Sequence, residues 1–232
     1  MKMEQFKKNL KEIWRGEAEK SVFMKYFFVV FSIYLFAAIY AMLVYPGEFS
    51  FTGVYTSYLG GNEKNPPGYM VYNASELIVG SLLIPNFIYF YKNLREFGKL
   101  FVFITCLFGI IGCIGFASLG IFYEGFISIG HAIATALAFG GFGISCFFFL
   151  LLYLGRLFTK KEYPTIKGFL ALYGGTFFIL FIALFLTIWK SETTTWGIPP
   201  EYYKDQFTEW IFLLVVVYWL IMHVIIAPQR RS

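Results

Sequence analysis

The sequence predicts an all-α integral membrane protein, built as a six-transmembrane-helix bundle with an N-terminal amphipathic helix. Of the 232 residues, 58% are hydrophobic and only 14% are charged. Soluble domains carry roughly a quarter charged residues, so lipid must solvate much of this chain. A third observation is the recurrence of apolar runs of about 20 residues, the length that spans a bilayer as a helix.

Residues 1–21 predict a cytoplasmic amphipathic helix. Its apolar residues recur at helical spacing: Met3, Phe6, Leu10, Ile13 and Trp14. Lysine and arginine lie largely away from this stripe, as in helices that lie in the membrane interface and favour anionic lipid. Packing beneath the bundle is an equally good alternative. The segment is charged and lacks a cleavage site, so no signal peptide is expected.

Six apolar stretches predict a transmembrane domain over residues 22–227, followed by a cytoplasmic tail, 228–232. The expected spans are 22–44, 71–92, 98–122, 126–152, 165–189 and 206–227. The loops between them are short, apart from 45–70 and 190–205.

The basic residues predict the orientation, because lysine and arginine accumulate on the cytoplasmic side of membrane proteins. With the N-terminus inside, sixteen of the 19 basic residues fall on the inner side, and Lys64, Lys190 and Lys204 fall outside. The sequence therefore predicts a multi-pass protein of the cell membrane with both termini cytoplasmic. The two long loops are then exterior.

Small residues recur at four-residue spacing in the third and fourth spans. They are Gly109, Gly112, Cys113, Gly115 and Ala117, then Ala132, Ala136 and Gly140. Such faces let helix backbones approach closely in lipid, so the two spans are expected to be a tight antiparallel pair. The same faces are compatible with a homo-oligomer.

The positions of the cysteines and basic residues also limit which cofactors and partners are expected. The three cysteines, Cys106, Cys113 and Cys146, lie within apolar runs and lack the spacing of a metal site. No cofactor or metal is predicted. The basic residues form no face with interleaved aromatics, which argues against nucleic acid and leaves membrane lipids as the expected partners.

Polar residues near the outer ends of the spans predict an outward-facing pocket. Charged groups within a span are costly and mark function by default. The predicted ligand-binding residues are Ser57, Asn65, Asn73, Glu76, Glu124 and His131. Asn73, Glu76 and Gly80 share one helix face, because they are three and four residues apart. Glu76 and His131 are expected to face each other, with Glu124 above. Glu209 opens the sixth span at the same depth. The alternative is that these groups only bond to one another and lock the bundle.

Three functions remain open at this stage. The first is a lipid-handling or lipid-organising protein without catalysis. The second is an enzyme acting on a lipid headgroup, with His131 as general base and Ser57 as a candidate nucleophile. The third is a transporter of a small neutral solute, since the uncharged midplane argues against an ion path.

Two motifs resemble those of a prokaryotic multi-pass membrane family known only as domain of unknown function 998. They are Ser57-x-Leu59-Gly60 followed by Asn65-Pro66, Asn73 and Gly80, and Gly120-Ile121-Phe122 followed nine residues later by His131. Family members often have proline where this chain has Tyr123. The family is similar to the eukaryotic Frag/DRAM/Sfk membrane proteins, which are linked to lipid-anchor remodelling, autophagy modulation and plasma-membrane lipid organisation. The resemblance implies a fold and a membrane location rather than a reaction.

Overall fold

The computed structural model describes residues 2–158, 165–179 and 205–228, and these residues form helices and connections without a strand. The long helices are α1 (Lys2–Trp14), α2 (Lys20–Leu43), α3 (Tyr69–Leu94), α4 (Lys99–Leu119), α5 (Ser128–Phe158) and α8 (Asp205–Ile226). The short elements are η1 (Thr56–Gly60), η2 (Arg95–Phe97), α6 (Ile166–Phe169) and η3 (Leu170–Gly174).

Among the described residues, five helices are long and apolar enough to cross a membrane: Lys20–Leu43, Tyr69–Phe97, Lys99–Leu119, Ser128–Phe158 and Glu209–Ile226. They correspond to the first four predicted spans and the last. The fifth predicted span, 165–189, is described only over the shorter apolar helix Ile166–Ile179. Its remainder and nearly all of the predicted loop 190–205 lie outside the described residues.

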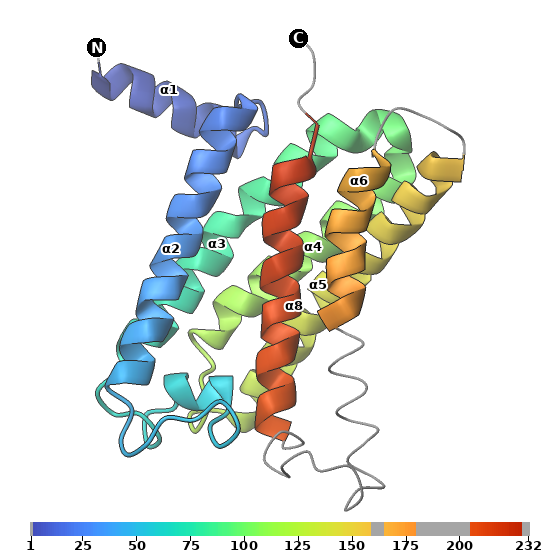
Figure 1. Cartoon of the computed structure of the whole chain (residues 1–232). Helices are drawn as coiled ribbons and strands as arrows, with labels where there is room; N and C mark the ends of the chain where they lie inside the picture. The colour runs from blue at the N-terminus through green and yellow to red at the C-terminus, as the bar shows by residue number, and fades with distance from the viewer. Residues whose placement is uncertain (1, 159–164, 180–204, 229–232) are drawn as a thin grey trace, which may run out of the picture.

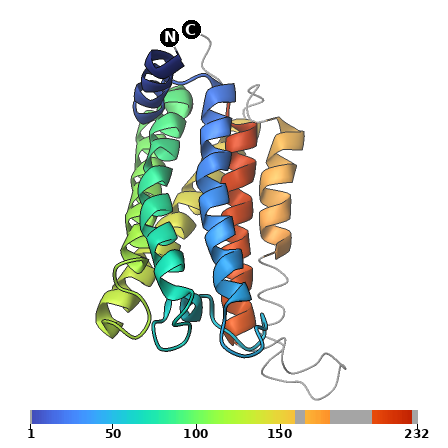
Figure 2. The same cartoon turned by 90° about the vertical axis from the view of Figure 1, so that its left-hand side faces the viewer.

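The spanning helices lie side by side; α2, α3, α4 and α5 alternate in direction, and α8 runs in the same direction as α3 and α5 (Figures 1 and 2). Residues 44–68 and 120–127 connect them at one end, which we call the loop end. At the opposite end, which we call the terminal end, α1 extends sideways from the beginning of α2, and α8 finishes there. Because the connections 95–98 and 120–127 are short, α3, α4 and α5 are consecutive antiparallel neighbours.

Gly16 separates α1 from α2. Its φ of 66° lies in the left-handed region, which glycine adopts without steric cost. A Cβ at this position would also lie 2.8 Å from the carbonyl oxygen of Ile88 on α3. Ile13 is buried against the bundle, whereas Met3 and Phe6 of α1 are 71% and 65% exposed. The apolar stripe of α1 is therefore mostly uncovered within the described chain.

Glycines bring α3, α4 and α5 into close contact, which the small-residue pattern predicted for α4 and α5. A Cβ on Gly80 would collide with the backbone of Ala117, and one on Gly115 would collide with the backbone of Ala138. Gly141 meets the backbone of Gly112 in the same way. These small faces are used within the bundle, and the homo-oligomer stays a prediction.

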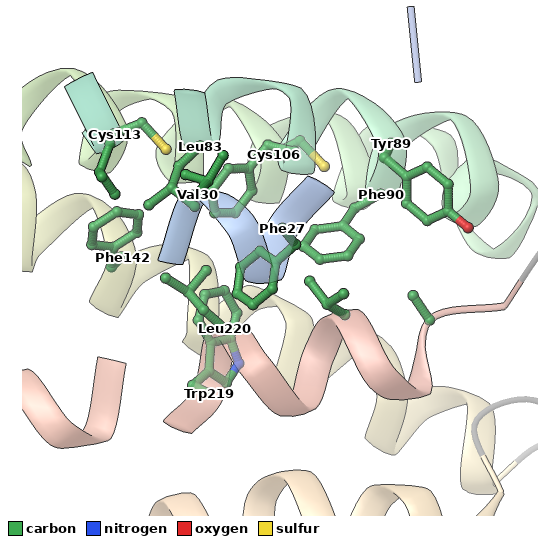
Figure 3. Packing of buried hydrophobic residues seen from close by; sticks show 14 of the residues in the cluster. Phe27, Val30, Leu83, Tyr89, Phe90, Cys106, Cys113, Phe142, Trp219 and Leu220 are labelled. Carbon is green, nitrogen blue, oxygen red and sulfur yellow. The ribbon is translucent and has the colours of Figure 1, made fainter. Parts of the chain in front are cut away.

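Aromatic side chains fill the terminal half of the bundle. Phe87, Phe90, Phe149 and Trp219 are all at most 1% exposed. Figure 3 shows side chains from α2, α3, α4, α5 and α8 pointing toward one another in this region and next to it on the side of the loop end. His223 lies among the rings, with Nε2 2.7 Å from the hydroxyl of Tyr153. This packed layer forms the floor of the cavity described next.

Candidate functional site

A cavity of about 500 Å³ lies in the loop half of the bundle, between α2, α3, α4, α5, α8 and η1. Its polar lining includes Tyr34, Thr56, Ser57, Tyr72, Asn73, Glu76, Glu124, His131, Thr135 and Glu209. Its apolar lining includes Phe27, Phe31, Val79, Leu83, Phe116, Phe142, Leu213, Val216 and Leu220. Five of the six predicted site residues therefore line one cavity.

The lining changes from polar to apolar along the helix axes. On α5 it runs from His131 to Phe142, and on α8 from Glu209 to Leu220, eleven residues in each case. At 1.5 Å per residue the cavity is about 16 Å deep. That is about half the 30 Å hydrocarbon thickness of a bilayer. A molecule that fills the cavity would have its polar end at the loop end and an apolar end near the midplane.

Glu76 lies in the second turn of α3 and is 7% exposed. Its side chain faces the cavity, and no described residue donates a hydrogen bond to its carboxyl group. Burial of a polar group without a partner is costly, and burial of an unpaired charge is more so. Asn73 shares this helix face and also lines the cavity, as predicted. Gly80 does not line it, because that glycine packs against Ala117 of α4.

An aromatic corner lies next to Glu76. The hydroxyls of Tyr34 and Tyr72 are 2.9 Å apart, and their rings are tilted at a centroid distance of 5.9 Å. The ring of Phe116 meets that of Tyr34 edge-on at 5.3 Å. Sequence analysis missed both tyrosines, which lie within helical segments of mostly apolar residues. Hydroxyls inside a span were the available signal, since each needs a partner in the membrane.

Glu209 joins the site from α8. Its Oε1 accepts a hydrogen bond from the hydroxyl of Thr56, and the backbone N–H of Ser57 donates to the same oxygen at 3.4 Å. Glu209 lies close enough to Glu76 for their charges to interact. The loop segment η1 is thereby attached to α8. Thr56 and Glu209 were absent from the predicted site, although the depth of Glu209 in the sequence indicated it.

A second contact attaches the loop to α8. The indole N–H of Trp210 donates to the carbonyl oxygen of Val54 at 2.8 Å. The rings of Phe49 and Phe51 pack edge-on against the Trp210 ring, at 5.9 and 5.1 Å. The 44–68 connection therefore forms a fixed cover over the loop end of the cavity.

His131 is held in one ring orientation. Its Nδ1 lies 2.8 Å from the carbonyl oxygen of Phe122, and a carbonyl only accepts, so Nδ1 carries the hydrogen. Nε2 lies 3.6 Å from a carboxylate oxygen of Glu124. The expected proximity of His131 and Glu124 is thus present. No hydrogen bond or ion pair joins His131 to Glu76 among these described side chains; both line the cavity.

Asn65 and Asn73 fasten the loop to the helices. The Nδ2 of Asn65 donates to the carbonyl oxygens of Ala41 and Leu59, at 3.0 and 3.1 Å. The Nδ2 of Asn73 donates to that of Gly60 at 2.9 Å. A Cβ on Gly60 would collide with the Asn73 side chain. Asn65 is fully buried and does not line the cavity, so its predicted ligand contact has no support from its position.

The arrangement limits the chemistry available. Ser57 lines the cavity but its hydroxyl makes no hydrogen bond with His131 in the structure. Among the described residues, no three histidine, cysteine or acidic side chains gather closely enough to hold a metal ion. The cavity instead offers carboxylates, hydroxyls, aromatic rings and an apolar extension.

Comparisons with protein-family models, curated proteins and solved structures found no match for this chain. The resemblance to domain of unknown function 998 stays a prediction, and the function is argued from the pocket.

Proposed function

We propose that this protein binds an amphiphilic membrane lipid in the cavity, with the headgroup at the loop end and one hydrocarbon chain in the apolar end. One observation carries the proposal: a single cavity changes from polar to apolar over about 16 Å, the depth of one bilayer leaflet. Ligand sites are typically concave and mostly apolar, with few polar groups that fix orientation. The protein is then lipid-handling or lipid-organising, without catalysis.

The proposal includes a topology in the cell membrane. The chain spans the bilayer six times, with both termini cytoplasmic, and the cavity faces the outer leaflet. The distribution of lysine and arginine in the sequence supports this orientation. Helix α1 then lies in the inner interface, with its exposed apolar residues in lipid and its lysines at anionic headgroups.

A steric test separates a lipid-filled cavity from an empty packing defect. Val216 of α8 lines the apolar end, and Val216→Trp would fill that space. We expect the wild-type protein, released from mild detergent into a mass spectrometer, to retain one lipid adduct that the variant loses. Leu214→Trp is the matched control, because Leu214 lies on the same helix, is 53% exposed and does not line the cavity. Bare protein in all three samples would refute lipid binding.

A second candidate function is a lipid-headgroup enzyme with His131 as general base. The observation that favours it is the hydrogen bond from His131 Nδ1 to Phe122, which leaves the lone pair of Nε2 on a side chain that lines the cavity. Against it, the group that lies 3.6 Å from Nε2 is a carboxylate rather than a hydroxyl.

The third candidate, a neutral-solute transporter, finds less support. The packed rings of Phe87, Phe90, Phe149 and Trp219 lie between the described cavity and the terminal end.

A further inference from the structure

The charged lining of the cavity is strongly unbalanced. Three carboxylates line it, those of Glu76, Glu124 and Glu209, and the lining described by the structure contains no lysine or arginine. His131 is the single basic side chain in that lining, and its Nε2 is directed at Glu124. A headgroup with a net negative charge placed there would meet like charges at short range without a fixed cation. The loop end of the cavity therefore favours a positively charged group.

Glu76 supplies an independent indication that the cavity takes a cationic ligand. Glu209 accepts hydrogen bonds from Thr56 and Ser57, and an oxygen of Glu124 lies 3.6 Å from Nε2 of His131. Glu76 is buried to the same extent as an interior side chain, faces the cavity, and receives no hydrogen bond from a described residue. A cationic group beside it would provide both a counter-charge and hydrogen-bond donors.

The aromatic corner adds a second attraction for the same kind of group. Tyr34, Tyr72 and Phe116 line the cavity with Glu76. Faces of aromatic rings attract ammonium groups, and clusters of such rings with a carboxylate are the usual cage for quaternary ammonium ions. Tyr72 and Glu76 are four residues apart on α3 and so share one helix face, and the Tyr34 hydroxyl lies 2.9 Å from that of Tyr72.

We propose that the ligand's headgroup is cationic at nitrogen: a protonated amine or a quaternary ammonium that lies between Glu76 and the rings of Tyr34, Tyr72 and Phe116. The proposal rests on the lipid-binding function above and specifies its ligand class. Zwitterionic lipids with an amino headgroup and single-chain amphiphilic amines share this chemistry. Lipids with an uncharged glycerol headgroup on their phosphate do not.

The experiment is a competition between headgroups on identical acyl chains. Protein in neutral detergent is mixed with equal amounts of phosphatidylethanolamine and phosphatidylglycerol, and the adducts are weighed by native mass spectrometry. We expect the wild type to retain the ethanolamine lipid about tenfold over the glycerol lipid, the ratio that one charge-assisted hydrogen bond supplies. In Glu76→Gln, which keeps the shape, we expect the two adducts to become about equal. Glu63→Gln removes an exposed loop carboxylate outside the cavity and should keep the wild-type ratio.

A second variant tests whether misfolding, rather than loss of the carboxylate, explains a lost headgroup preference in Glu76→Gln. Tyr34→Leu keeps a buried apolar side chain but removes one ring of the corner, so adducts should persist while the preference falls about threefold. The melting temperature of each variant in the same detergent reports whether the bundle is intact. If the wild-type preference for the ethanolamine lipid persists in both Glu76→Gln and Tyr34→Leu, the cation does not lie between Glu76 and the aromatic rings.

The remaining outcomes separate this inference from the lipid-binding function. Equal ethanolamine and glycerol adducts in the wild type would refute a cationic headgroup and leave lipid binding standing. No adduct of either lipid would refute lipid binding itself, unless added dodecylamine alone gives a stoichiometric adduct that Glu76→Gln abolishes. That last result would identify a soluble amphiphilic amine, rather than a bilayer lipid, as the source of the cation.

Discussion

At the residue scale, the same kinds of side chain serve two different purposes at the loop end. Asn65 lies in the loop and Asn73 near the beginning of α3, both in a polar stretch of the sequence, and both donate to backbone carbonyls that fasten the loop. Glu76 has the same sequence context, yet its carboxyl group faces the cavity. Residue type and depth predicted where polar groups gather. They did not predict which of them bond to the backbone, because that depends on where the loop carbonyls come to lie.

His131 allows the enzyme candidate to be tested at a single residue. Its Nε2 faces Glu124 and has no hydroxyl within hydrogen-bond reach in the structure, so we expect no general-base catalysis. Vesicles of ethanolamine and glycerol phospholipids that contain the protein should release no free headgroup, and His131→Gln should behave identically. Headgroup release by the wild type that disappears in His131→Gln would instead establish the enzyme.

At the element scale, hydropathy predicted the spanning helices to within a few residues at most ends. The exceptions have local causes. Helix α4 ends at Leu119, before the predicted 122, and the connection that follows includes Gly125 with a φ of 89°. Helix α5 continues to Phe158, six residues beyond the predicted end, since its last turn remains helical although it contains Arg156. The pairing of α4 with α5 followed from their small residues.

Close glycine contacts make the α4–α5 pair sensitive to side-chain size. In Gly115→Leu, the new side chain would meet the backbone of Ala138, which has no room to move aside. We expect the free energy of unfolding to fall by about 1–3 kcal/mol or more, which should lower the melting temperature in detergent by at least about 2 °C.

Gly140→Leu is the control for that prediction, because no described atom lies within 4 Å of a Cβ at Gly140. Leucine also has a higher helix propensity than glycine, so the melting temperature of the Gly140→Leu variant should be unchanged or higher. Equal losses in the two variants would contradict the close packing of α4 against α5.

At the scale of the whole molecule, the cavity depends on parts that are far apart in the sequence. The carboxylates of Glu76, Glu124 and Glu209 come from α3, the α4–α5 connection and α8, and Tyr34 comes from α2. Helical periodicity relates residues within one segment only. The membership of Tyr34 therefore required the tertiary arrangement, whereas Glu76, His131 and Glu124 were predicted from their depth in the membrane, and the depth of Glu209 indicated it as well.

The orientation of the whole bundle is open to direct labelling. With the native cysteines replaced by alanine, Ser50→Cys places a thiol in the loop end, and Lys7→Cys places one on α1. Because basic residues favour a cytoplasmic N-terminus, we expect a membrane-impermeant maleimide to label Ser50→Cys in intact cells and Lys7→Cys only after lysis. The reverse labelling pattern would show that the cavity faces the cytoplasm.

Lys20 joins the beginning of α2 to the end of α8. Its ammonium group donates to the carbonyl oxygens of Ile225 and Ala227, each at 2.7 Å, across more than 200 residues of chain. During synthesis, α8 emerges from the ribosome after every other described helix. Helix α8, which supplies Glu209 and Leu220 to the lining of the cavity, is thus added last. The hydrogen bonds of Lys20 to Ile225 and Ala227 form only then. A nascent chain would have its membrane helices inserted well before it could hold a lipid.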